Sequence, residues 1–189
     1  MNAVNERAQG GRSPFIRVRT GAVIAVAVAV GIVLWLLLRD NGDKNTTKTA
    51  GGPVAASRSD LRAVPDSVGY PVFWAGRKSG YTYELSKTTR GTYVRYLPPG
   101  VPLGDNHPKY TTIASYPFKN AFAATKKAGT KKGAITRSLP GGGIAIANAA
   151  VAKSVYVSFP GTNVQVEVFD PSPARARHLA FSGKIVPVR

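Results

Sequence analysis

One short stretch of the sequence, residues 101–109, brings an acid and an imidazole together as Asp105 and His107. A general base in a hydrolase or transferase needs such groups, provided that a nucleophile or water is held in a fixed position beside them. The same stretch reads Gly-Asp-Asn before His107 and Pro after it, which is typical of a tight turn with the histidine exposed. The pattern favours the turn over the catalytic pair.

Other signs of catalysis are weak. The sequence has no cysteine, which excludes a disulfide scaffold, a thiol nucleophile and a Cys-ligated zinc site, and its two histidines leave few metal ligands. His178 lies in an expected helix, whose dipole it complements. Residues 140–143, Pro-Gly-Gly-Gly, lack the spacing of a phosphate-binding loop and predict a hairpin turn. We therefore expect no enzymatic activity, no cofactor and no metal site.

Positive charge is the strongest chemical signal. The chain has 26 Lys and Arg against nine Asp and Glu, a formal charge of +17, which favours an anionic partner. Four lysines fall within seven residues at the end of an expected helix and in the loop after it: Lys126, Lys127, Lys131 and Lys132. We expect these four to form an anion-binding surface. Alternatively, they only complement a helix dipole and keep the helix end soluble.

Residues 21–38 form an apolar segment of 18 residues without a polar side chain other than the Trp35 indole. A helix of that length spans about 27 Å, close to the hydrocarbon core of a bilayer, so the segment predicts a transmembrane helix. Four arginines lie in residues 1–20, whereas the charges just after residue 38 are balanced. This asymmetry predicts a cytoplasmic N-terminus. A cleaved signal peptide fits less well, because its apolar core is shorter and a small-residue cleavage site follows it closely.

The rest of the chain divides by composition. Residues 39–68 are rich in Asn, Thr, Gly, Ser and balanced charge without apolar periodicity, which predicts a flexible linker. Residues 69–189 hold 17 Lys and Arg against four acids, a net charge of +13. They are expected to form a basic extracytoplasmic domain.

Within this domain apolar and polar residues mostly alternate. Val164, Val166 and Val168, for example, share one face of a predicted strand. Half-buried alternation is typical of antiparallel sheets. Helices are expected at 117–128 and at about 171–182, each beginning near a proline and followed by a glycine. The sequence thus predicts an α+β domain, a mainly antiparallel sheet with two helices.

Residues 72–129 and 134–183 resemble each other. TYVRYLPPG (92–100) parallels SVYVSFPG (154–161), and residues 111–129 parallel 165–183 with the same interval from proline to glycine. The similarity predicts a duplicated ββββα unit, whose two helices would share one face of the sheet. Identities are few, so the alternative is a chance likeness of two α+β segments.

At TYVRYLPPG and VSFPGTNVQVEVFDPSPARAR the chain resembles a group of uncharacterised single-pass membrane-anchored proteins of high-GC Gram-positive bacteria. The resemblance covers the anchor and the whole domain, and its motifs are structural turns. It implies a cell-membrane location with the C-terminal domain in the envelope, and it transfers no activity or site residue.

Together these features predict a membrane-anchored extracytoplasmic binding module. Its expected partner is an anionic envelope component, such as an anionic lipid or a wall polymer, or a membrane protein. Two alternatives stay open: an envelope hydrolase or transferase that uses Asp105 and His107, and an extracytoplasmic nucleic-acid binder.

Overall fold

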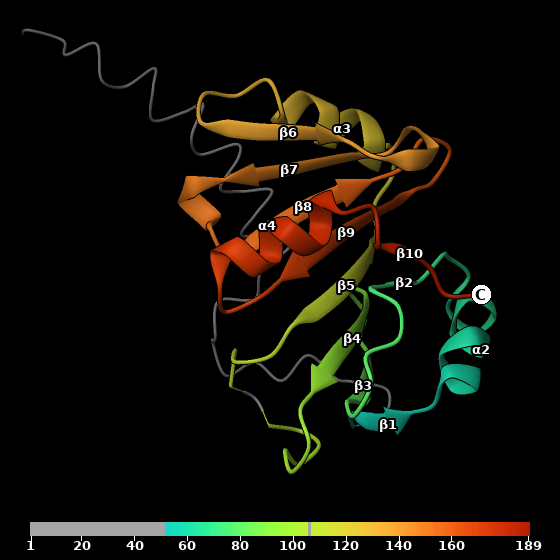
Figure 1. The fold of residues 1–189 in the computed structure, drawn as a ribbon. Helices are drawn as coiled ribbons and strands as arrows, with labels where there is room; N and C mark the ends of the chain where they lie inside the picture. The colour runs from blue at the N-terminus through green and yellow to red at the C-terminus, as the bar shows by residue number, and fades with distance from the viewer. Residues whose placement is uncertain (1–51, 106) are drawn as a thin grey trace, which may run out of the picture. The chain divides into compact units, whose positions relative to one another are not determined.

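The computed structural model describes residues 52–105 and 107–189, and their main feature is an eight-stranded sheet in the order β1-β3-β4-β5-β9-β8-β7-β6 (Figure 1). Every neighbouring pair is antiparallel, and β2 pairs with β10 in a separate small sheet. The strands are β1 (Val54–Ala56), β2 (Phe73–Trp74), β3 (Thr82–Lys87), β4 (Thr92–Leu97), β5 (Thr112–Pro117), β6 (Ala134–Ser138), β7 (Ile144–Asn148), β8 (Ser154–Ser158), β9 (Val164–Phe169) and β10 (Val186–Pro187). The helices are α2 (Arg58–Val68), α3 (Ala121–Ala128) and α4 (Pro173–Phe181). The predicted α+β class with a mainly antiparallel sheet is confirmed.

One face of the large sheet carries the main apolar core. Ile113, Val155 and Val166 lie on this face of β5, β8 and β9, and each is fully buried. Alternation along the strands places these residues on the same side, so that the helices can cover them together. The helices contribute Leu61 and Val64 from α2, and Ala176 and Ala180 from α4.

Helix α3 packs on the opposite face. Its Thr125 hydroxyl lies 2.7 Å from the Ser158 hydroxyl and accepts a hydrogen bond from Gln165 at 3.0 Å. Ser158 follows Val157, which belongs to the apolar core, so Ser158 must point to the other side of the sheet. Figure 1 shows α4 in front of the sheet and α3 behind it. The expectation that both helices share one face is therefore wrong.

The register of the strands explains this difference. The internal similarity aligns residues 111–129 with 165–183, and this equates Ile113 with Glu167. In the sheet, Ile113 pairs with Val168 on the apolar face, whereas Glu167 pairs with Ala114 on the other face. A shift of one residue moves a strand's side chains to the other side of a sheet. Residues that the internal similarity equates in β5 and β9 therefore point to opposite faces of the sheet, and the helices that follow these strands, α3 and α4, lie on opposite faces as well.

The prediction of a flexible linker at 39–68 is wrong for its second part, which forms β1 and α2. Helix α2 begins with a capping box, in which the Ser57 hydroxyl accepts from the Asp60 backbone N–H and the Asp60 carboxylate accepts from the Ser57 N–H. Its Leu61 is fully buried. The composition of residues 39–68 as a whole resembles a spacer, but the capping box and Gly69 at φ 75° are local signals for the two ends of this helix. Residues 39–51 lie outside the described residues.

The predicted cytoplasmic tail and transmembrane segment, residues 1–38, also lie outside the described residues. Among residues 52–105 and 107–189, none of the helices is both long and apolar enough to cross a bilayer.

Candidate anion-binding surface

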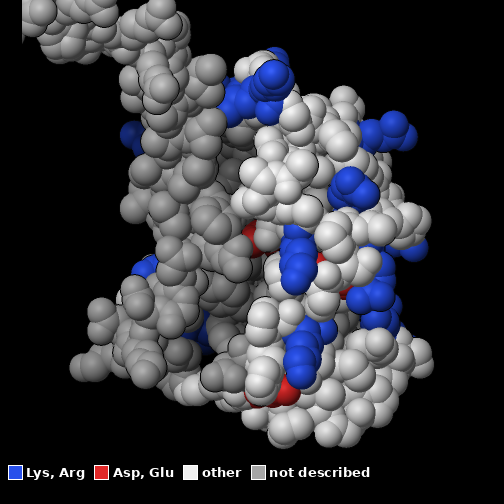
Figure 2. Space-filling model, turned by 90° about the vertical axis from the view of Figure 1, so that its left-hand side faces the viewer, with Lys and Arg blue, Asp and Glu red and all other residues white. Residues whose placement is uncertain are grey.

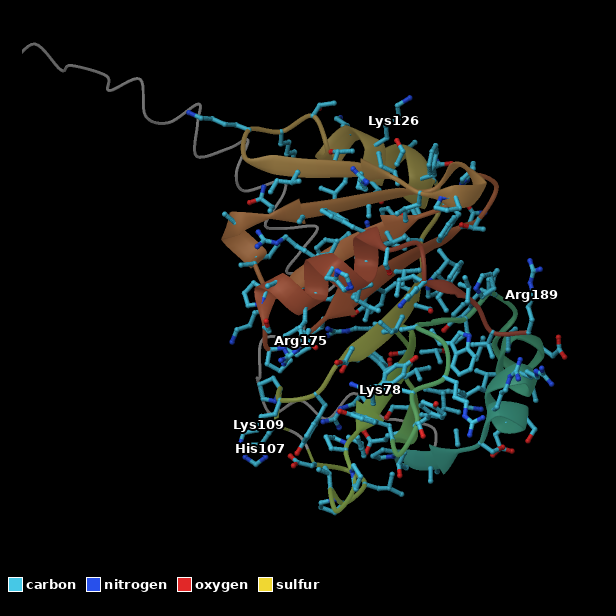
Figure 3. The ribbon with its side chains drawn as sticks, in the orientation of Figure 1. Lys78, His107, Lys109, Lys126, Arg175 and Arg189 are labelled. Carbon is cyan, nitrogen blue, oxygen red and sulfur yellow. The ribbon has the colours of Figure 1, made fainter. Side chains whose placement is uncertain are left out.

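The four lysines predicted to bind anions lie around the C-terminal end of α3. Lys126 and Lys127 occupy its last turn, and Lys131 and Lys132 follow in the loop to β6. All four side chains are exposed, and Figure 3 shows Lys126 pointing away from the domain. Among the described residues, none of the four forms a salt bridge. The structure thus brings together the residues that the sequence singled out; we call them the α3 lysine cluster.

The loop that carries this cluster is ordered by local hydrogen bonds. The backbone N–H groups of Thr130 and Lys131 donate to the carbonyls of Lys127 and Ala128, at 3.3 and 3.2 Å. Gly129 lies so close to the sheet that an added Cβ would come within 2.7 Å of the Thr136 hydroxyl. The loop therefore holds its two lysines beside the end of α3 and next to β6.

Three carboxylates of the domain, those of Glu84, Glu167 and Asp170, are engaged by internal hydrogen-bond donors. Glu84 on β3 is 1% exposed; its Oε1 accepts from the Arg95 guanidinium at 2.6 Å and its Oε2 from the Gly104 N–H at 2.6 Å. Glu167 on β9 accepts from the Tyr116 and Ser154 hydroxyls, at 2.8 and 2.5 Å. Burial, together with the nearby Glu167 carboxylate, raises the pKa of Tyr116 well above its usual range. That phenol therefore remains a neutral donor.

Asp170, at 3% exposure, is the third acid bonded to internal donors. It accepts from the Arg175 guanidinium at 3.0 Å, from the Thr111 hydroxyl at 2.7 Å and from the Ser172 backbone N–H at 2.8 Å. The Asp60 carboxylate accepts a hydrogen bond in the capping box of α2, and its hydrogen bonds with Ser57 lower the pKa of Asp60. These acids serve the fold, so they give little surface negative charge with which the lysines could pair.

The balance at the surface is consequently cationic. The described residues contain 19 Lys and Arg against six Asp and Glu. Two of the cations, Arg95 and Arg175, form salt bridges with buried acids. On the face drawn in Figure 2, Lys and Arg are spread widely and Asp and Glu form only small areas.

Asp105 and His107 do lie together, but in the geometry of a turn. The Asp105 Oδ1 accepts from the His107 backbone N–H at 2.9 Å and contacts the His107 Nδ1 at 2.6 Å, while Oδ2 accepts from the Tyr110 hydroxyl at 2.8 Å. These bonds, the backbone one first, hold the pKa of Asp105 well below its usual range. Arg95 donates to the carbonyls of both Asp105 and His107. The carboxylate thus organises the loop, and the described contacts of the pair include no serine or threonine hydroxyl.

His178 lies at an exposed position on α4 beside β6. It lines a shallow groove of about 380 Å³ together with Ile135, Arg137 and Phe181, among others. Among the described residues, no group of three or more His, Asp or Glu could hold a metal ion. Residues 140–143 form the hairpin turn that the sequence predicts, because the Leu139 N–H donates to the Gly143 carbonyl and β6 pairs with β7.

The structure contains a second cationic site, which the sequence analysis did not predict. Arg58 at the start of α2 and Arg77 and Lys78 in the β2–β3 turn line one pocket with Trp74, Tyr81 and Tyr83. Nineteen positions separate Arg58 from Arg77, and Arg58 stood in the expected linker, so no local pattern could connect them. In Figure 3, Lys78 lies far from Lys126, which shows that this pocket is separate from the α3 lysine cluster.

No protein-family model, curated protein or solved structure matches this chain. The geometry described above is therefore the basis for assigning a function.

Proposed function

We propose that this protein is a single-pass membrane protein whose C-terminal domain binds an anionic component of the cell envelope through the α3 lysine cluster. The proposal combines the sequence-based topology, with residues 1–20 cytoplasmic and residues 21–38 in the membrane, with the cationic surface of the domain. An anionic membrane protein partner would meet the same surface.

The main support for this proposal is that most acidic side chains of the domain accept hydrogen bonds within the fold. Glu84, Glu167 and Asp170 are bonded to internal donors, and Asp105 is bonded within its own loop. A domain whose cations served only solubility and stability would gain most from spreading acids among them. Here the excess positive charge is left facing solvent, where it creates a field that attracts anions.

No other stretch of seven residues in the chain holds as many Lys and Arg as the α3 lysine cluster. Cations at a helix C-terminus gain about 0.3–1 kcal/mol from the dipole, and this effect fades beyond the last turn. Lys131 and Lys132 lie past the helix end, so the dipole does not account for them. Near an anionic surface each Lys contributes about 1 kcal/mol. An anionic partner therefore explains the concentration of charge better than helix stability does.

The test is a binding titration of the full-length chain in non-ionic detergent, with fluorescently labelled polyphosphate as a soluble polyanion and fluorescence anisotropy as the readout. In one variant Lys126, Lys127, Lys131 and Lys132 are all changed to Gln. The control variant carries Gln at four exposed cations outside α3 and its loop, namely Lys109, Lys153, Arg177 and Lys184. Both variants lose the same charge.

We expect the cluster variant to bind up to roughly 1,000-fold more weakly, and the control variant to lose far less. Raising the salt from about 0.1 M to 1 M should weaken binding by the unchanged protein, because the screening length falls from about 10 Å to 3 Å. Unchanged binding by the cluster variant would refute the site. Non-ionic micelles doped with phosphatidylglycerol, titrated in the same way, test the lipid headgroup as the source of negative charge.

The internal similarity is a separate proposal about the origin of the fold. The strand order β3-β4-β5 meets β9-β8-β7 at the central β5–β9 pair, which supports a duplication. Because α3 and α4 lie on opposite faces, a duplication requires a one-residue shift between the two copies, at β5 in one copy or β9 in the other.

A further inference from the structure

The β2–β3 turn is held in place by two tyrosine hydroxyls from the large sheet. The Tyr96 hydroxyl accepts from the Ala75 N–H at 2.7 Å and donates to the Gly76 carbonyl at 3.1 Å. The Tyr83 hydroxyl accepts from the Lys78 N–H at 2.9 Å. Burial raises the pKa of Tyr96 well above its usual range, so it remains a neutral hydrogen-bonding group. The start and the middle of the turn are thus fixed to the sheet.

The rings of these tyrosines are themselves packed. Tyr83 meets Tyr96 edge to face with centroids 5.3 Å apart, and Trp74 meets Tyr83 in the same way at 5.9 Å. Trp74 is 6% exposed and Tyr96 is 3% exposed. The backbone of the turn therefore rests on a rigid aromatic base.

Three cations line the pocket beside this turn, which has a volume of about 340 Å³. The Lys78 ammonium lies 3.8 Å above the centre of the Tyr81 ring, a cation–π contact that fixes its position. Arg77 belongs to the same turn, and Arg58 comes from the first residue of α2. No carboxylate lines the described pocket, and the nearby Asp60 is engaged by the Ser57 N–H in the helix cap.

The chemistry of the lining selects the ligand class. Three cations match a group that carries more than one negative charge; a phosphate monoester carries about −1.5 to −2 at neutral pH, whereas a carboxylate carries one. Guanidinium groups also fit phosphate oxygens through paired N–H donors.

A nucleobase fits the pocket less well. Base stacking requires an open aromatic face. Trp74 is almost buried, Tyr83 is packed between two rings, and Lys78 covers one face of Tyr81. The rings act as walls that hold the cations.

We propose that the pocket formed by Arg58, Arg77 and Lys78 against Trp74, Tyr81 and Tyr83 is a binding site for a phosphate monoester or pyrophosphate group. This inference deepens the proposed anion binding by adding a defined site with a small ligand, and it holds even if the α3 lysine cluster proves inert. The phosphate could belong to a lipid headgroup or to a water-soluble phosphate ester.

The experiment is calorimetric titration of the full-length chain, in non-ionic detergent, with inorganic pyrophosphate. The variant carries Arg77→Gln and Lys78→Gln; the control carries Lys153→Gln and Lys184→Gln, two exposed cations outside the pocket. We expect saturable binding by the unchanged protein, a loss of about tenfold or more in the pocket variant, and little change in the control. Equal thermal unfolding temperatures show that both variants are folded.

The variant with Gln at all four lysines of the α3 cluster separates the two proposals, because it should retain pyrophosphate binding while it loses polyphosphate. Titrations with glycerol 3-phosphate and with micelles that contain phosphatidic acid identify the source of the phosphate, and binding of either supports the site. Absence of saturable pyrophosphate binding would overturn the proposal, as would equal losses in the pocket and control variants. Citrate binding as tight as that of pyrophosphate would overturn the assignment to phosphate.

Discussion

Arg95 on β4 faces Glu84 on β3 across one pair of the antiparallel ladder, with the Arg95 Nη1 2.6 Å from the Glu84 Oε1. The Glu84 side chain is 1% exposed, and that of Arg95 is 16% exposed. From this position Arg95 also donates to two carbonyls of the loop at 101–109. The pair therefore connects the sheet to the loop that contains Asp105 and His107.

Changing Arg95 to Met should destabilise the domain by about 3–5 kcal/mol, because it leaves the buried Glu84 carboxylate without its positive partner. The double variant, with Glu84→Gln as well, should recover a large part of this loss. Urea unfolding followed by tryptophan fluorescence measures both changes. A loss below about 1 kcal/mol in the single variant would contradict a buried pair and indicate one screened by solvent.

The hydrogen bonds that Asp105 accepts make its loop sensitive to acid. Because the folded state lowers the pKa of Asp105, its contribution to stability is present above the unfolded value of about 3.9 and is lost as the pH falls toward the folded value. The protection factors of the Gly104, His107 and Lys109 amides, which correct for the slower intrinsic exchange in acid, should therefore fall in this acid range. Asp105→Asn should lower them in the same way at neutral pH, whereas Asp66→Asn, at an exposed position, should not.

Parts of this architecture could be predicted from the sequence. Val164, Val166 and Val168 lie on the apolar face as the alternation requires, and the α3 lysine cluster lies at a helix end and its loop as expected. The predicted start of α3 at residue 117 is wrong, because β5 extends through Pro117 and the helix begins only after Asn120, a residue at φ 60°. Local patterns fix which residues alternate, but not where an extended strand turns into a helix.

The pocket at Lys78 could not be predicted, for a different reason. Its cations come from α2 and from the β2–β3 turn, and their proximity depends on the docking of α2 near the edge of the sheet. Leu61 and Val64 provide that docking, and with Val68 they follow the helical spacing i, i+3, i+7; this stripe predicts a helix but not the surface on which it packs. Such a site depends on tertiary packing, which a local pattern does not report.

Gly91 is required by the close approach of the β3–β4 turn to β5. A Cβ at this position would lie 2.6 Å from the Ser115 carbonyl oxygen, a backbone atom that cannot rotate away. Gly91→Ala should therefore destabilise the domain by about 1–3 kcal/mol, the usual cost of overpacking. Gly52→Ala is the control, because nothing lies within 4 Å of its added Cβ. Urea unfolding of the two variants should differ clearly; equal midpoints would contradict the close contact.

Leu61→Ala tests whether α2 is part of the domain. Leu61 is fully buried in the main core, so its truncation should cost about 2–5 kcal/mol. Ala63→Ser, an exposed substitution on the same helix, should change the unfolding free energy little. If Leu61→Ala also had little effect, residues 58–68 would act as the linker that their composition suggests.

The proposed topology can be tested by proteolysis of intact, wall-stripped cells. With the N-terminus cytoplasmic, added protease should reach the domain and the residues that precede β1, and should leave a short fragment that contains residues 1–38. The folded domain should resist digestion, because its core includes α2 and its backbone is paired in the sheet, so cleavage is expected before Val54 rather than inside the sheet. A Leu61→Ala variant, whose native state opens more often, should be digested faster after release. Inside-out vesicles provide the control: there the N-terminal tail should be cleaved and the domain protected, and the reverse pattern would show the opposite orientation.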